Sequence, residues 1–114
     1  MTVKILLERK FNEDPSLEEI QTINKLRIGA MQRKGYVSGE TLVDLKDQRR
    51  IVVISVWADK EEWEAWLSSD ERRNLGANLD KNLKQPPIIR SFMLGADYLG
   101  QVFEEVMYDS ETKK

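Results

Sequence analysis

The sequence predicts an α+β domain in which a four-stranded antiparallel sheet carries its helices on one face. Segments with the two-residue apolar period of strands alternate with segments of helical spacing, in the order strand, helix, strand, strand, helix, helix, strand, which is a split βαβ pattern. The length of 114 residues suits one domain with a single core. With 40% hydrophobic and 33% charged residues, the composition is that of a folded soluble protein.

The first predicted strand spans residues 3–11, and a helix follows over residues 15–33. The side chains on one side of this strand are apolar: Val3, Ile5, Leu7 and Phe11. Asp14 is expected to cap the helix, with Pro15 at its first position, where a missing N–H costs nothing. The helical stripe recurs every three or four residues: Leu17, Ile20, Ile23, Asn24, Arg27, Ala30 and Met31. Gly35 is expected to end the C-terminal turn.

Two strands joined by a polar turn are predicted next, over residues 36–45 and 51–57. One side of the first strand consists of Val37, Thr41, Val43 and Leu45. The turn, residues 46–50, contains only charged and amide side chains. The second strand is apolar at both parities, which predicts a strand that is buried on both faces at the centre of the sheet. Trp57 at its end is assigned to packing.

Two helices are predicted after this central strand. Asp59 and Glu62 form an Asp-x-x-Glu signature, similar to a capping box, that opens the first of them. The apolar side of this helix consists of Trp63, Trp66 and Leu67. The second helix is predicted over residues 70–84 from the four-residue spacing of Leu75, Leu79 and Leu83. Gly76 weakens its continuity.

A last strand is predicted over residues 88–94 and a last helix over residues 97–107. Pro86 and Pro87 stop the preceding helix because proline cannot continue it. The strand carries Ile88, Phe92 and Leu94 on one parity. The last helix is amphipathic, and a polar tail follows it.

One face of the predicted sheet has no helix to cover it, although it is apolar. Residues 51–56 are apolar toward both faces, and Leu6 points away from Ile5 and Leu7. A second copy of the chain is the simplest cover, so we expect a homodimer through the open sheet face. In the alternative, residues 97–107 fold back over this face in a monomer.

The composition excludes several classes of chemistry. The chain has no histidine and no cysteine, which removes disulfides, thiolate ligands and imidazole-based catalysis. The net charge of -2 and the short apolar runs lead us to expect neither a nucleic-acid nor a membrane partner. No signal peptide is visible, which predicts a cytoplasmic location. The acidic residues at 59–64 suit the first turn of a helix, so no metal site is predicted.

Four segments carry a family resemblance: residues 35–39, 50–57, 60–63 and 66–73. Together they resemble the antibiotic biosynthesis monooxygenase (ABM) family. The resemblance implies a ferredoxin-like α+β fold that pairs through its sheets into a dimeric α+β barrel. Residues 1–95 are expected to form this ABM-like domain, and residues 96–114 an extra C-terminal amphipathic helix with a polar tail.

Residues 55–57 and 66–70 are most similar to the haem-degrading branch of this family. The resemblance implies that Trp66 belongs to the pocket. That branch also uses an axial histidine, whose position falls near Gly76, and a pocket asparagine, whose position falls at residues 8–9. Neither residue type is present there, which argues against haem degradation by that route. No cofactor is predicted, and haem or flavin bound without a motif stays open.

Other members of the family oxidise polycyclic aromatic compounds without metal or cofactor. The resemblance therefore implies a small cofactor-independent monooxygenase that acts on an aromatic or polycyclic substrate in a pocket between helices and sheet. Such a reaction needs a dry pocket with a cation or hydrogen bond near the developing oxyanion. The candidate catalytic residues are Trp66 and Arg90. The candidate ligand-binding residues are Arg9, Asn24, Tyr36 and Trp63.

Structural roles compete with these assignments. The three-residue spacing of Trp63 and Trp66 also fits a core stripe. Arg9 and Arg90 also fit ion pairs at a sheet edge. The basic pairs at 49–50 and 72–73 are interpreted as solvated surface. The alternative function is a non-catalytic dimeric module that binds a small apolar or haem-like ligand.

Overall fold

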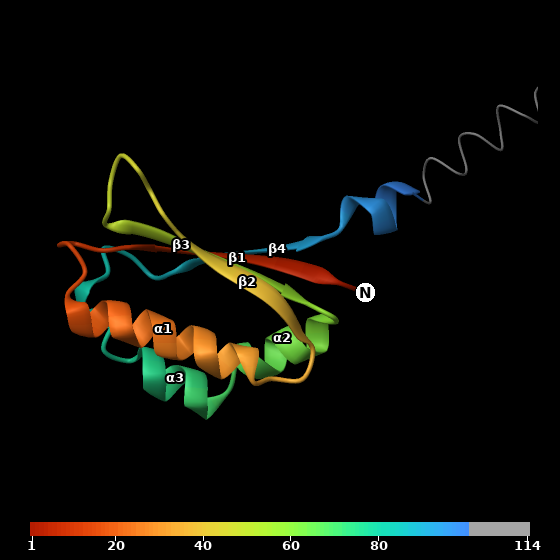
Figure 1. The fold of residues 1–114 in the computed structure, drawn as a ribbon, viewed down its shortest axis with the longest axis horizontal. Coiled ribbons are helices and arrows are strands. Elements are labelled where there is room, and N and C mark those ends of the chain that lie inside the picture. The colour runs from red at the N-terminus through yellow and green to blue at the C-terminus, as the bar shows by residue number, and fades with distance from the viewer. Residues whose placement is uncertain (101–114) are drawn as a thin grey trace, which may run out of the picture.

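The computed structural model describes residues 1–100 and confirms the predicted α+β fold. Its strands are β1 (Val3–Lys10), β2 (Tyr36–Val43), β3 (Arg50–Trp57) and β4 (Ile88–Met93). The helices below the sheet are α1 (Leu17–Met31), α2 (Lys60–Leu67) and α3 (Asp70–Gly76), with a 3-10 turn at Asp80–Asn82. The strands form one antiparallel sheet in the order β2-β3-β1-β4, and α1, α2 and α3 share one of its faces (Figure 1).

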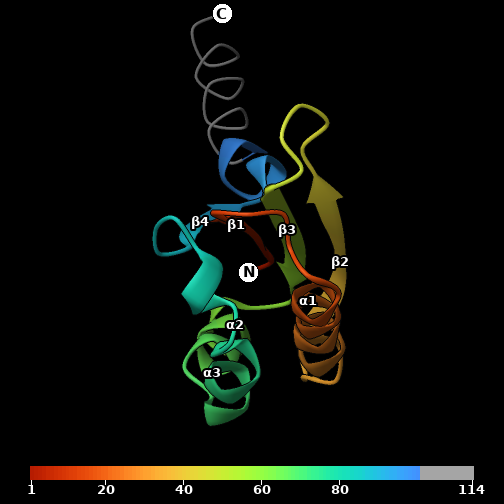
Figure 2. The same ribbon diagram turned by 90° about the vertical axis from the view of Figure 1, so that its left-hand side faces the viewer.

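The pairing register decides which side chains of the sheet face the helices. Ile5 of β1 pairs with Ser55 of β3 and Ser91 of β4, which places alternate residues of these strands on the helix side. The buried side chains between sheet and helices are Val3, Ile5, Phe11, Ile23, Leu26, Ala30, Ile51, Trp57, Trp63, Trp66 and Leu79. Figure 2 shows the two layers that enclose this core.

The cap of α1 corrects the sequence prediction, because Ser16 and not Asp14 caps this helix. The Ser16 Oγ accepts the Glu19 N–H at 3.1 Å, and a Glu19 carboxylate oxygen accepts the Ser16 N–H at 2.9 Å. This reciprocal capping box satisfies two N–H groups at once, which Asp14 and Pro15 cannot do. Leu17, which was expected on the apolar stripe, is 72% exposed.

Ser16→Ala is expected to lower the free energy of unfolding by about 1 kcal/mol, because the Glu19 N–H loses its acceptor. Asp14→Ala is the matched control and should change this free energy by less than about 0.5 kcal/mol. Urea unfolding at one fixed protein concentration, followed by tryptophan fluorescence, measures both. Equal losses in the two variants would contradict the assignment of Ser16 as the cap.

The helix predicted over residues 70–84 is also shorter in the structure, where α3 ends at Gly76. Beyond it the chain turns and forms the 3-10 turn at residues 80–82, and Leu79 between them is 1% exposed. A glycine costs about 1 kcal/mol relative to alanine inside a helix, which favours an end at this position. The four-residue spacing of the leucines arises because their side chains all face the core, and it does not indicate one continuous helix.

The sheet face opposite the helices carries apolar side chains at the surface of a single chain. Leu6 and Ile54 pair across β1 and β3 on this face and are only partly buried. Phe92 on β4 is 50% exposed. Residues 95–100 are helical and extend past the end of the sheet (Figure 1). The alternative cover, residues 97–107, lies mostly outside the described part of the chain.

Two features of the whole chain remain predictions: the division into residues 1–95 and 96–114, and the cytoplasmic location. Within residues 1–100, no helix has both the length and the apolar character needed to cross a bilayer.

Candidate active site

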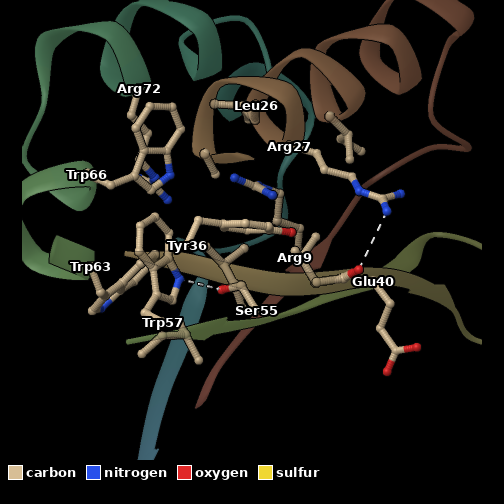
Figure 3. Close-up of a pocket in the computed structure, with 16 residues that line it drawn as sticks. Arg9, Leu26, Arg27, Tyr36, Glu40, Ser55, Trp57, Trp63, Trp66 and Arg72 are labelled. Atoms are coloured by element: carbon tan, nitrogen blue, oxygen red, sulfur yellow. Dashed lines mark hydrogen bonds between the residues drawn. The ribbon is translucent and has the colours of Figure 1, made fainter. Parts of the chain in front are cut away.

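A pocket lies between α1, the segment from α2 to α3 and the inner face of the sheet (Figure 3). Strands β1, β2 and β3 form its floor, and its walls combine aliphatic side chains, aromatic rings and guanidinium groups. Water-sized molecules can occupy about 60 Å³ of it, which is room for about four waters. The pocket therefore suits a small organic molecule.

An aromatic block closes one end of this pocket. The rings of Tyr36 and Trp57 meet edge to face, with centroids 5.4 Å apart and planes at 86°, a favourable arrangement for aromatic pairs. Trp63 tilts against Trp57 at 5.8 Å. Trp57 is 0% exposed, and its Nε1 donates to the Ser55 Oγ at 3.0 Å. The packing role predicted for Trp57 is confirmed, and these contacts fix the orientation of its indole.

Trp66 forms the pocket wall on the helix side and is held in place by Gly29 of α1 and by Arg33, which follows this helix. A Cβ atom at Gly29 would lie 2.8 Å from the Trp66 Cη2, so the missing side chain makes room for the indole. The Arg33 guanidinium carbon lies 5.4 Å from the Trp66 ring centroid, within cation–π range, and the Arg33 Nη2 donates to the Ala65 carbonyl at 3.3 Å. Trp66 is 4% exposed, so it belongs to the core and lines the pocket at once.

Arg9 projects from β1 into the pocket without an anionic partner. It pairs in register with Ile51 on the helix side of the sheet and is 7% exposed. Among residues 1–100, the ion pairs do not include Arg9, and its nitrogens face the open space of the pocket. Burial, then repulsion from Arg72, lowers the pKa of Arg9 to about 10, and Asp80 offsets only part of this. Arg9 is therefore a buried positive charge at neutral pH.

Arg72 brings a second guanidinium group into the pocket from α3. The Ser69 Oγ caps this helix by accepting the Arg72 N–H at 3.2 Å, and Arg72 lines the pocket. Arg73 faces solvent, where it pairs with Asp70 at 2.5 Å. Burial lowers the pKa of Arg72, and the charge of Asp80 raises it in part. The interpretation of this basic pair as solvated surface is therefore wrong for Arg72.

The pocket brings together four of the six predicted site residues: Arg9, Tyr36, Trp63 and Trp66. Arg90 lies on the helix-free face of the sheet, because it pairs in register with Leu6. Asn24 is exposed on α1. The expectation that these two side chains face the pocket is corrected. Within the described residues, no three or more acidic side chains gather closely enough to hold a metal ion.

Three residues of the site were missed by the sequence prediction: Arg27, Gly29 and Arg72. Arg27 lines the pocket and donates to the Gly39 carbonyl at 3.5 Å, which joins α1 to β2 (Figure 3). Arg27 follows Ile23 by four residues on the same helix, and this spacing indicates that the two side chains share a face. No such signal existed for Arg72, because a break between α2 and α3 separates it from Trp66.

Comparisons with known proteins give a family and a fold. The family model described as antibiotic biosynthesis monooxygenase matches residues 15–77 of this chain. Among solved structures, SnoaB of Streptomyces nogalater is described as a cofactor-independent oxygenase. It has a TM-score of 0.72 and 15% identity, and the match covers 82% of this chain and 92% of that one.

Two further structures have the same fold. A conserved protein from Methanosarcina mazei has a TM-score of 0.73 and 12% identity, and the match covers 81% of this chain and 91% of that one. Rv0793 from Mycobacterium tuberculosis has a TM-score of 0.73 and 11% identity, and the match covers 82% of this chain and 95% of that one. No curated protein matches this chain significantly.

Proposed function

We propose that this chain, which belongs to the antibiotic biosynthesis monooxygenase family, is a small oxygenase that oxidises an aromatic substrate in this pocket without a cofactor. The observation that carries the proposal is a pocket in which aromatic walls surround two guanidinium groups. Arg9 and Arg72 have no ion-pair partner among residues 1–100. The likeness in fold to SnoaB, described as a cofactor-independent oxygenase, supports the same class of reaction.

Such a reaction takes its electrons from the substrate itself. A hydroquinone ring loses a phenolic proton, and the anion reduces O₂ and forms a carbon–oxygen bond to it. The O–O bond then breaks, so that one oxygen atom stays on the ring and the other leaves as water. In total, one hydroquinone and one O₂ give one hydroxyquinone and one water, so no external reductant is needed.

The side chains of the pocket have distinct roles in this proposal. The Arg9 guanidinium stabilises the phenolate and the peroxide anion. A low-dielectric site strengthens this electrostatic attraction. Trp63 and Trp66 hold the ring and exclude water. The Tyr36 hydroxyl lies against Gly39, where a Cβ atom would collide with it, and in this proposal it donates a hydrogen bond to a substrate oxygen.

Oxygen uptake with a series of hydroquinones tests this function. We expect uptake above the rate without protein and a loss of about a hundredfold in Arg9→Met, because an anion-stabilising group is removed. Trp66→Phe is expected to reduce turnover by loosening the wall. Arg73→Met, which changes an exposed arginine of α3, is the matched control and should keep full activity.

The outcome also decides between the two candidate functions. Binding of hydroquinones without any oxygen uptake would leave a non-catalytic binding module, which the absence of any imidazole base in the chain favours. Loss of turnover in Arg90→Ala but not in Arg9→Met would place the essential cation on the other face of the sheet.

We also propose that the chain forms a homodimer through the helix-free sheet face. Leu6, Ile54 and Phe92 on this face would otherwise expose apolar surface to water. The family membership supports the same association.

Ile54→Asp is expected to convert this dimer into single chains of 13.3 kDa, because a carboxylate at the centre of an apolar interface loses its hydration without gaining a partner. Gln21→Asp, on the exposed side of α1, is the control and should stay dimeric. Native mass spectrometry and light scattering at the same concentration measure both variants. A single-chain mass for the unmodified protein would contradict the dimer.

A further inference from the structure

We propose that the substrate of this pocket is a single-ring aromatic carboxylate, whose carboxylate binds between Arg9 and Arg72 while its ring lies against the tryptophan wall. This proposal rests on the proposed oxygenase function and names the class of substrate that the same site selects.

The first line of support is the number of positive charges. Arg9 and Arg72 both line the pocket, and their mutual repulsion contributes to the lowered pKa of Arg9. Asp80 attracts both guanidinium groups but forms an ion pair with neither. Arg9 is 7% exposed and Arg72 is half-buried, and a buried charge without a partner is costly, so the site is complete only when an anion occupies it.

The second line of support is that the pocket contains two guanidinium groups, whereas a phenolate supplies only one negative charge. A phenolate that forms during the reaction can pair with one guanidinium group, which leaves the other without an ion-pair partner. A substrate that carries a permanent carboxylate supplies the second negative charge before the reaction begins. Guanidinium groups suit this role because they bind carboxylates through paired hydrogen bonds. The charge of the pocket therefore favours a ring that bears both a phenol and a carboxylate.

The third line of support is the size of the pocket. Its open space of about 60 Å³ holds about four waters, which is roughly the volume of one substituted ring. A fused ring system is larger than this space and would extend through the mouth of the pocket into solvent, unless α1 moved away from the sheet and from α2. The hydrogen bond from Arg27 to the Gly39 carbonyl holds α1 against β2, and the packing of Trp66 on Gly29 holds α2 against α1, so both contacts oppose a widening of the pocket.

A pair of ligands that differ only in charge tests the proposal. Benzoate and benzamide have nearly the same shape, and their affinities follow from quenching of tryptophan fluorescence and from calorimetry with the full-length protein. We expect benzoate to bind at least about tenfold more tightly, as for a hydrogen bond to a charged group. We expect 2-naphthoate to bind more weakly than benzoate because of its second ring.

Matched variants then identify the residues that cause the preference for benzoate over benzamide. Arg9→Met and Arg72→Met should each reduce the affinity for benzoate toward that for benzamide, while benzamide binding changes little. Arg73→Met should keep the preference of the unmodified protein. Equal affinities for benzoate and benzamide, or a preference that survives when Arg9 and Arg72 are both replaced, would overturn the proposal.

A separate activity measurement distinguishes failure of this proposal from failure of the oxygenase function. Oxygen uptake is compared for 2,5-dihydroxybenzoate and hydroquinone, each corrected for its rate without protein. We expect a higher kcat/KM for the carboxylate. Equal turnover of both would leave the oxygenase function standing and overturn the carboxylate specificity. Selective binding of benzoate without uptake by either hydroquinone would support the specificity and overturn the oxygenase function.

Discussion

Arg9→Met is expected to raise the free energy of unfolding of the ligand-free protein by about 2 kcal/mol, although it removes a residue of the proposed site. Lowering the pKa of Arg9 from its ordinary value to about 10 corresponds to about 3 kcal/mol of unfavourable free energy for the charged form in the folded state. Methionine follows the same path as the arginine stem and leaves only part of the volume unfilled, which costs about 1 kcal/mol.

The sign of this effect follows from proton binding. Between pH 10 and the higher ordinary pKa of arginine, the unfolded chain binds more protons at Arg9 than the folded chain does, so this group's penalty shrinks as the pH rises through that range. Below pH 10 the penalty is complete, so a measurement at pH 7 records all of it. Urea unfolding of Arg9→Met and of the control Arg73→Met at one protein concentration gives the comparison. A loss of stability in Arg9→Met would show that the guanidinium has a partner in the folded state.

Trp57→Ala is expected to lower the free energy of unfolding by about 3–5 kcal/mol, the range for removing a large buried aromatic side chain. Trp57 is 0% exposed and contacts Tyr36 and Trp63, so its removal leaves a cavity beside two other rings. Ser55→Ala separates the contribution of the hydrogen bond, which is expected to be about 1 kcal/mol.

Circular dichroism and urea unfolding at low temperature measure these two variants, because Trp57→Ala removes much of the stability that a small domain has. Tryptophan fluorescence is unsuitable here, since the substitution removes one of three tryptophans. A loss below about 1 kcal/mol would contradict the assignment of Trp57 to the centre of the core.

The sheet was predictable from the sequence because its side chains alternate with a simple period. The central strand, β3, is apolar at both parities, and the structure places it between two neighbours. Helix ends were less predictable, because they depend on which of several polar residues caps the helix. Asp14 and Ser16 are both good caps by type, and only the reciprocal bond with Glu19 decides between them.

The site was predictable only where one element determines the direction of a side chain. Arg9 shares the parity of Ile5 and Leu7 on one strand, and it lines the pocket as expected. Arg90 shares the parity of Ile88 and Phe92 on a strand with apolar residues at both parities. Its direction depends on pairing with a distant strand, which periodicity does not reveal.

The unpaired charge of Arg9 has a consequence for the amount of this protein in a cell. When its pocket is empty, the chain carries an unfavourable buried charge and unfolds more often than the ligand-bound chain does. Proteases degrade chains from the unfolded state. A ligand that neutralises Arg9 lowers the population of this unfolded state according to its concentration relative to its Kd. If the proposed substrate supplies the anion that neutralises Arg9, the half-life of the chain is expected to rise with the supply of that substrate.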